Sequence, residues 1–287
     1  MPKLSFVKAH GLGNDFLLVE DKDLDGISPA EAARSICDRH TGVGADGLVL
    51  LGPEKAGAIP FRILNADGTE SELSGNAMRC AAAWLISRRE SPKPDSELLL
   101  DTRAGRKRNV FRGRKGDAWM FTSEIAQPVF TPEKIPFVPP NPLPEPVLDY
   151  ALPLGDDTLP ITTLWMGNPQ CVTFVDHFDA VNWLALGEAI EVHPYFPERV
   201  NVGFVRILAR NRIAARFWER GVGHTLASGT GCCACAVAAA VNGKTGRRVA
   251  VETELGEMAV NWRKADGVVE LTGPAKIVAQ GAFFLVE

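Results

Sequence analysis

Two short serine-glycine motifs recur in the chain, and each opens an alanine-rich run. The first is Ser74–Asn76 (SGN), and the second is Ser228–Thr230 (SGT), 154 positions later. We call each motif a glycine elbow. Glycine lets the backbone approach a ligand closely, and the first N–H groups of a helix attract anions. Two elbows that face one another would hold a single carboxylate from both sides.

The residue at the head of each elbow is a candidate for proton transfer. Two such heads would stand on opposite faces of the carbon beside the bound carboxylate. A racemase or epimerase needs this geometry, because one group removes the α-proton and the other returns a proton to the opposite face. Both heads are serine, Ser74 and Ser228. The alternative interpretation is two serines that only cap helices, and the matched pair favours a site.

Asparagines in predicted turns form a second group of candidates. Each one alone is a weak signal, because asparagine favours turns for local reasons. Together with Glu219 and Arg220 at the end of a predicted strand, they could bind an amino acid. Arginine makes bidentate contacts with carboxylates, and Glu219 could meet an ammonium group or act as a base. The five asparagines are Asn14, Asn65, Asn76, Asn168 and Asn201.

Histidine and cysteine add fewer candidates. His224 lies four residues before Ser228 and would titrate near neutral pH, so it either enters the same site or lies on a glycine-rich loop. The run Cys232–Cys235 contains three cysteines, but no second cysteine pair of the kind that zinc sites use. We therefore predict buried thiols and no metal site. A disulfide framework is not expected in a chain of this size without an export signal.

Composition restricts the function classes. The chain has 287 residues, 46% of them hydrophobic and 23% charged, which is typical of globular proteins. A net charge of −4 gives no electrostatic basis for nucleic-acid binding. No stretch approaches the roughly 20 apolar residues of a membrane span, and the N-terminus lacks a signal-peptide core. We expect a cytoplasmic protein without nucleic-acid or membrane partners.

The 154-residue offset indicates an internal duplication. It also pairs residues 13–14 with 167–168, and residues 62–65 with 216–219. Each half reads as strands with one long alanine-rich helix, at 76–88 and 230–241, so the predicted class is α+β with a sheet wrapped around a central helix. Shorter helices are expected at 29–39 and 183–191. Strands are expected at 4–8, 16–19, 47–51, 61–64, 97–102, 107–112, 118–122, 161–166, 171–175, 202–208, 213–219, 248–253, 257–263, 267–272 and 281–286.

Proline content suggests the domain boundaries. Eight prolines fall between Pro128 and Pro146, which argues against helix and for an extended linker. We therefore expect an N-terminal domain at 1–127, a linker at 128–146 and a C-terminal domain at 147–276.

Six segments, in order along the whole chain, resemble the diaminopimelate epimerase family. They are HGLGNDF (10–16), GVGADG (42–47), NADGTESELSGNAMRC (65–80), MGNPQC (166–171), FPERVNVGF (196–204) and ERGVGHTLASGTG (219–231). The resemblance implies an isomerase of lysine biosynthesis with two pseudo-symmetric domains, an amino-acid substrate in the cleft between them, no cofactor and a homodimer. It also implies that the last strand, 277–287, returns to the first domain.

The resemblance assigns the candidate residues to two ends of the substrate. Four side chains would hold the distal, non-reacting end: Asn65, Asn168, Asn201 and Arg220. The reacting end would be held by Asn14 and by the backbone of Gly75, Asn76, Gly229 and Thr230.

Three departures from the family pattern bear on catalysis. Members carry cysteine where this chain has Ser74 and Ser228, and those thiols are the acid and the base. Gln170 replaces a histidine that tunes the first thiol, and His224 replaces a later glutamate, whereas Glu219 is retained. A serine hydroxyl needs a neighbouring base. Cys80 and Cys233 lie more than a helical turn beyond the elbow heads, at roughly 1.5 Å per residue.

Four hypotheses stay open at this point. The chain is an isomerase that moves an α-proton with Glu219, His224 or a serine–base pair. Alternatively, it is a diaminopimelate epimerase whose activity is weak or was abolished by the loss of both thiols. The third hypothesis is a tautomerase or double-bond isomerase of a carboxylate on the same fold. The fourth is a non-catalytic amino-acid-binding protein.

Overall fold

The computed structural model describes residues 3–24, 26–141, 143 and 145–284. The chain divides into two compact units. The first comprises Met1–Glu124 and Thr272–Glu287, and the second comprises Ile125–Leu271. The C-terminal strand therefore belongs mainly to the first unit.

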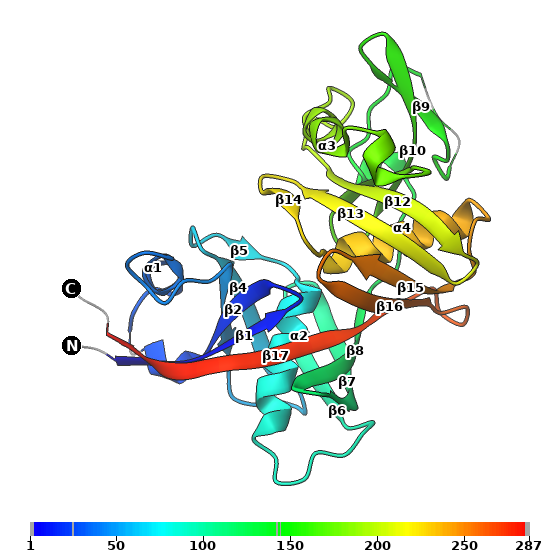
Figure 1. Ribbon diagram of the computed structural model, residues 1–287. Coiled ribbons are helices and arrows are strands. Elements are labelled where there is room, and N and C mark those ends of the chain that lie inside the picture. Colours follow the sequence, from blue (N-terminus) through cyan, green and yellow to red (C-terminus); the bar gives the residue numbers. More distant parts are fainter. Residues whose placement is uncertain (1–2, 25, 142, 144, 285–287) are drawn as a thin grey trace. The chain divides into compact units, whose positions relative to one another are not determined.

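The first unit is a sheet that closes on itself (Figure 1). The strands β1, β2, β3, β4, β6, β7 and β8 pair in this order, and β5 pairs with β4. Strand β17 pairs with β1 in antiparallel register from Lys3↔Phe284 to His10↔Lys276, and it also pairs with β8. Its strands are β1 (Lys3–Gly11), β2 (Asn14–Glu20), β3 (Gly47–Leu51), β4 (Ile59–Asn65), β5 (Glu70–Ser71), β6 (Glu97–Thr102), β7 (Gly105–Lys115), β8 (Ala118–Ala126) and β17 (Val269–Phe284).

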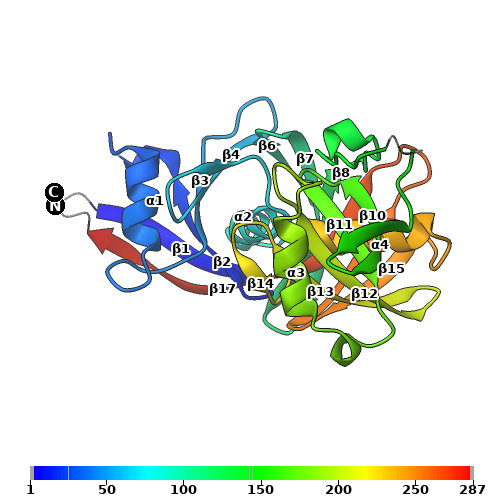
Figure 2. The same cartoon turned by 90° about the horizontal axis from the view of Figure 1, so that it is seen from above.

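Helix α2 (Gly75–Ser87) lies inside this sheet, as Figure 2 shows nearly along the helix axis. It contacts β1, β2, β3 and β7, so strands meet it on several sides. Small side chains make this possible, because alanine fills little space and favours helix. The smaller helix α1 (Pro29–Cys37) follows Ser28, whose side chain makes no capping hydrogen bond, and packs against β3 and β4.

The second unit repeats this arrangement around helix α4 (Gly229–Val241), which contacts β10, β11, β12, β13, β15 and β16. Helix α4 packs so closely that a Cβ on Gly203 of β12 would lie 2.5 Å from Cys235 Sγ. The other elements are β9 (Tyr150–Leu154), β10 (Asp157–Trp165), β11 (Pro169–Phe174), α3 (Trp183–Glu191), β12 (Asn201–Ala209), β13 (Arg212–Glu219), β14 (Gly223–Thr225), β15 (Arg248–Thr253) and β16 (Gly256–Trp262).

The order and direction of pairing match between the units, which supports the predicted duplication. In each, an antiparallel hairpin (β1–β2, β10–β11) is followed by a parallel pair (β2–β3, β11–β12) and an antiparallel pair (β3–β4, β12–β13). The parallel pairs β4–β6 and β13–β15 then follow. Helix α4 begins and ends 154 positions after α2. The α+β fold with a sheet around a central helix is therefore as predicted.

The proline-rich segment differs from the expected extended linker. It belongs to the second unit, where its Ile135 and Phe137 lie in the core with Phe196 and Phe204. A short 3-10 helix at Pro132–Lys134 also interrupts it. Proline excludes α-helix and sheet interiors, but it leaves the intervening apolar side chains able to pack. Residues 142 and 144 of this segment lie outside the described residues.

The C-terminal segment also differs from its prediction. Strands were expected at 267–272 and 281–286, and β17 instead runs unbroken from Val269 to Phe284. Pro274 falls within it, and residues 285–287 lie outside the described residues. The strands β5, β9 and β14 were not predicted. Strands β5 and β14 have only two and three residues, which carry too little periodicity.

Candidate active site

The two glycine elbows have the same local structure. Ser74 is the N-cap of α2, with φ −139° and ψ 118°, and its Oγ accepts a hydrogen bond of 3.2 Å from the N–H of Ala77. Ser228 is the N-cap of α4, with φ −128° and ψ 126°, and its Oγ accepts a hydrogen bond of 3.2 Å from the N–H of Gly231. Both serines therefore cap helices, and each holds its elbow in the same conformation.

At each elbow, capping leaves the first two N–H groups of the helix without a hydrogen-bond partner in the described part of the chain. The serine side chain and carbonyl satisfy the third and fourth N–H groups of each helix. Among the described residues, the N–H groups of Gly75, Asn76, Gly229 and Thr230 have no hydrogen-bond partner. Two adjacent N–H groups at a helix start are suited to bind a carboxylate oxygen.

A left-handed glycine precedes the first candidate asparagine of each unit. Gly13 has φ 85° and Gly167 has φ 84°, a conformation that glycine adopts without strain. These turns bring Asn14 to the first position of β2 and Asn168 to the position immediately before β11. Asn14 accepts a hydrogen bond of 3.1 Å from Nδ2 of Asn76, so the structure brings two predicted residues of the first unit together.

The candidates of the second unit form a connected group. Gln170 donates from Nε2 to Oδ1 of Asn168 at 2.6 Å. Gln170 is also the register partner of Asn201 across β11 and β12. Asn201 donates to the carbonyl of Pro169 at 3.0 Å, and its Oδ1 accepts the N–H of Arg220 at 3.0 Å. The guanidinium of Arg220 donates to the carbonyl of Glu198.

Asn65 and Glu219 occupy equivalent positions at the ends of β4 and β13. Oδ1 of Asn65 accepts a hydrogen bond of 3.1 Å from Ser71 on β5. Oε1 of Glu219 accepts a hydrogen bond of 2.9 Å from Thr225 on β14. Neither Ser71 nor Thr225 was predicted, although the 154-residue offset would have paired them.

His224 lies on the other side of this strand. Residues next to each other in a strand point to opposite faces, so His224 points away from the face where Thr225 meets Glu219. Its Nε2 is 2.7 Å from Oε2 of Glu254, and its ring lies edge-on to Trp183 at 5.0 Å. The structure does not bring His224 and Glu219 together.

Glu191, at the end of α3, holds the segment that carries Arg220. It accepts hydrogen bonds from Nε1 of Trp218 at 2.7 Å and from the N–H of Gly221 at 2.8 Å. Burial alone would raise the pKa of Glu191, but these bonds and Arg199 hold it below its usual value. The sequence carried no signal for this role, because the contact joins residues 27 to 30 positions apart.

The six cysteines are all buried free thiols. Burial raises the pKa of Cys80 to about 12, so this thiol is protonated at neutral pH. In the part of the chain that the structure describes, no three His, Cys, Asp or Glu side chains gather as metal ligands. None of the described helices is both long enough and apolar enough to cross a membrane.

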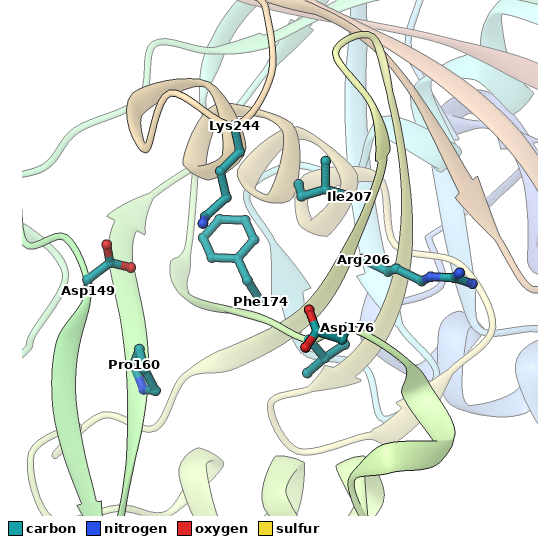
Figure 3. A pocket seen from close by; sticks show the side chains of 8 residues that line it. Asp149, Pro160, Phe174, Asp176, Arg206, Ile207 and Lys244 are labelled. Atoms are coloured by element: carbon teal, nitrogen blue, oxygen red, sulfur yellow. The ribbon is translucent and has the colours of Figure 1, made fainter.

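A surface cavity of about 470 Å³ lies in the second unit (Figure 3). Phe174 and Lys244 line it, with Lys244 Nζ 4.9 Å from the centre of the Phe174 ring. Two carboxylates, Asp149 and Asp176, lie along its edge and are exposed. None of the predicted site residues lines this cavity.

Comparison with known proteins agrees with these features. The sequence family described as diaminopimelate epimerase matches residues 6–113 and 162–278. The diaminopimelate epimerase of Pelotomaculum thermopropionicum is 41% identical over 283 residues, which cover 98% of this chain and 99% of that protein. The diaminopimelate epimerase of Heliobacterium modesticaldum is 39% identical and covers 97% of this chain and 99% of its own length.

A solved structure shares the fold at low sequence identity. The hydroxyproline epimerase of Agrobacterium vitis, with bound trans-4-hydroxy-L-proline, superposes with a TM-score of 0.70. The two sequences are 16% identical, and the match covers 100% of this chain and 94% of that one.

Proposed function

Because the chain belongs to the diaminopimelate epimerase family, we propose that it binds an amino acid with a second polar end and acts on its α-carbon without a cofactor. Diaminopimelate is the first compound to test. The reaction is removal of the α-proton on one face and return of a proton on the other. A homodimer, which the resemblance implies, stays a prediction.

The matched elbows are the observation that carries this proposal. Each offers two adjacent N–H groups without a described partner, Gly75 with Asn76 and Gly229 with Thr230. Each has a serine at its head in the same backbone conformation. A single elbow would be explained by helix capping alone. Two identical elbows on a duplicated scaffold are better explained by one substrate carboxylate that both contact, and we propose that it binds between the two units.

The side chains of the second unit suit the distal end of such a substrate. Asn168 has its oxygen engaged by Gln170, so its amide presents N–H groups. Asn201 has both its oxygen and one N–H engaged, and it holds the backbone of Arg220. We therefore assign Asn168 and Arg220 to direct contact with a carboxylate, and Asn201 to positioning of Arg220. Asn65 is assigned to the distal end by the family pattern.

The chemistry at the elbow heads is the altered part of the site. A serine hydroxyl removes a proton from carbon only with help from a base. Within its own unit, neither Ser74 nor Ser228 donates to a described carboxylate or imidazole. Glu219 is held by Thr225. We propose that proton transfer in this chain is slow, and that restoring thiols at both heads would accelerate it.

The test is exchange of the substrate α-hydrogen with D₂O, followed by proton NMR on meso- and L,L-diaminopimelate. The parent chain should exchange slowly or not at all, and Ser74→Cys/Ser228→Cys should exchange faster by orders of magnitude. Ser74→Ala/Ser228→Ala is the matched control, since it removes the hydroxyls and adds no thiol. Absence of any rise in the double cysteine variant would refute the impaired-epimerase proposal.

Two further outcomes separate the remaining alternatives. A different amino acid that loses its α-signal with the parent chain would identify a serine-dependent or Glu219-dependent isomerase. If no compound exchanges but diaminopimelate raises the melting temperature, the chain is a binding protein. A double-bond isomerase would instead show new vinyl signals from an unsaturated carboxylate.

A further inference from the structure

A chain of hydrogen bonds runs through the first elbow from a buried cation to a carboxylate. The guanidinium of Arg79 donates to Oδ1 of Asn76. Nδ2 of Asn76 donates to Oδ1 of Asn14 at 3.1 Å, and Nδ2 of Asn14 donates to Oδ2 of Asp46 at 2.6 Å. Asn14 and Asn76 are predicted site residues, whereas Arg79 and Asp46 are not.

The two charged ends fix the direction of this chain. Arginine carries only donors, so the atom of Asn76 that meets it must be the oxygen. An ionised carboxylate carries only acceptors, so the atom of Asn14 that meets Asp46 must be the nitrogen. Rotating either amide by half a turn would bring two donors or two acceptors together. Both amides therefore have one stable orientation, and successive bonds of this kind strengthen one another.

Tertiary contacts hold both ends of this hydrogen-bond chain, Arg79 and Asp46, in place. Arg79 is fully buried, and its Nε donates to the carbonyl of Pro274 on β17. Asp46 accepts hydrogen bonds from Arg39 at 2.7 Å and from the N–H of Asp15 at 3.0 Å. The orientation of the two asparagines thus depends on segments brought together only by folding.

We propose that Arg79 and Asp46 are positioning residues that fix the amides of Asn14 and Asn76 for the reacting end of the substrate. Each asparagine then keeps one further N–H on Nδ2, and the N–H groups of Gly75 and Asn76 add two more donors at this elbow. The first elbow presents donors, which selects a carboxylate over an ammonium group. This inference rests on the proposed function for its substrate and on the hydrogen-bond chain for its mechanism.

The side-chain amide signals of Asn14 and Asn76 in ¹H–¹⁵N NMR spectra test the chain without any ligand. In Asp46→Ala, the Asn14 signals should shift, and those of Asn76 should shift with them because the two amides are coupled. Asp46→Asn keeps an acceptor oxygen and should give smaller shifts. Asp101→Ala is the matched control, since Asp101 pairs with Arg106 on a hairpin of the same unit and is not part of the hydrogen-bond chain.

Asp46 is the informative end because its side chain is 42% exposed, so its replacement should leave the fold intact. Arg79→Met tests the other end and should shift Asn76 first, but removal of a buried charge can prevent folding. If Asp46→Ala shifts the Asn14 signals but leaves the Asn76 signals in place, the two amides are not coupled and the proposed hydrogen-bond chain is wrong.

Calorimetric titration with meso-diaminopimelate tests whether the hydrogen-bond chain affects ligand binding. Asp46→Ala should weaken binding about tenfold relative to the parent chain, and Asp101→Ala should not change it. If the NMR signals of Asn14 and Asn76 shift together but the affinity for meso-diaminopimelate is unchanged, the positioning role is wrong. The hydrogen-bond chain would then serve the structure alone. If the parent chain does not bind diaminopimelate, the substrate proposal fails, and the NMR result still decides whether the amides are fixed.

Discussion

Thr225 donates a hydrogen bond from Oγ1 to Oε1 of Glu219 at 2.9 Å, and Ser71 donates the equivalent bond to Asn65 at 3.1 Å. The two copies share a hydroxyl donor, and the acceptor is an amide in the first copy and a carboxylate in the second. Only the second copy therefore places a negative charge at the end of this strand. The two copies therefore share a hydroxyl donor at this position and differ in the charge of its acceptor.

Removal of the Thr225 hydroxyl should slow proton transfer. In the Ser74→Cys/Ser228→Cys background, Thr225→Val should lower the maximal rate of α-hydrogen exchange about tenfold, because a hydrogen bond to a charged group is worth roughly 1.5–3 kcal/mol. KM for diaminopimelate should change little if Thr225 acts only through Glu219, to which it donates its hydrogen bond. Steady-state exchange kinetics separate the two parameters.

Two variants control for this effect. Thr225→Ser keeps the hydroxyl and should retain most of the rate. Ser71→Ala removes the matching hydrogen-bond donor to the neutral amide of Asn65, and it should lower the exchange rate less than Thr225→Val does. An equal loss in Ser71→Ala and Thr225→Val would show that the carboxylate at Glu219 has no special part.

The stability contributed by Glu191 should depend on pH. Its folded pKa lies below the ordinary value of 4.5, so its contribution is fully present above about pH 4.5 and is lost as pH falls through the folded pKa. Glu191→Gln should lower Tm by on the order of 3 °C at pH 7, and the difference should shrink below about pH 4. Thermal unfolding of both proteins across this pH range measures it.

Glu188→Gln is the control on the same helix, because Glu188 is exposed. It should leave Tm within about 1 °C at every pH. A difference between the parent chain and Glu191→Gln that persists unchanged at low pH would mean that the carboxylate charge does not stabilise the loop carrying Arg220.

The native thiols should be inert and the restored ones reactive. Burial raises the pKa values of Cys37 and Cys80 to about 12, and all six cysteines are buried. A disulfide reagent at pH 8 should therefore find no fast-reacting thiol in the folded parent chain and six after unfolding. In Ser74→Cys, a thiol at a helix start should react, because that position lowers its pKa.

Ser87→Cys gives a comparison at the far end of α2, where no helix-start N–H groups are present to stabilise a thiolate. It should react more slowly than Ser74→Cys at the same pH. Fast reaction of the folded parent chain would mean that a buried cysteine can reach solvent and that a native thiol could replace a missing one.

The sequence predicted the repeated elements well for a local reason. Alanine-rich helices and alternating strands carry their own periodicity, so α2, α3 and α4 were placed to within one residue at each end. The short strands β5 and β14 were missed, and they carry Ser71 and Thr225. The segment 128–146 was predicted to be an extended linker, but it packs into the second unit. Its proline content indicates the backbone conformation and says nothing about the apolar side chains between the prolines.

The sequence by itself determined the duplication, the two elbows and the identity of their heads, because these are properties of residue type and spacing. Only the tertiary structure decided which atoms are left for a ligand. Helix capping uses two N–H groups at each elbow and leaves two. Folding brings Arg79, Asp46 and Pro274 to positions that orient Asn76 and Asn14, and it turns His224 toward Glu254 and away from Glu219. Hydrogen-bond direction depends on partners distant in the chain, which a linear pattern does not contain.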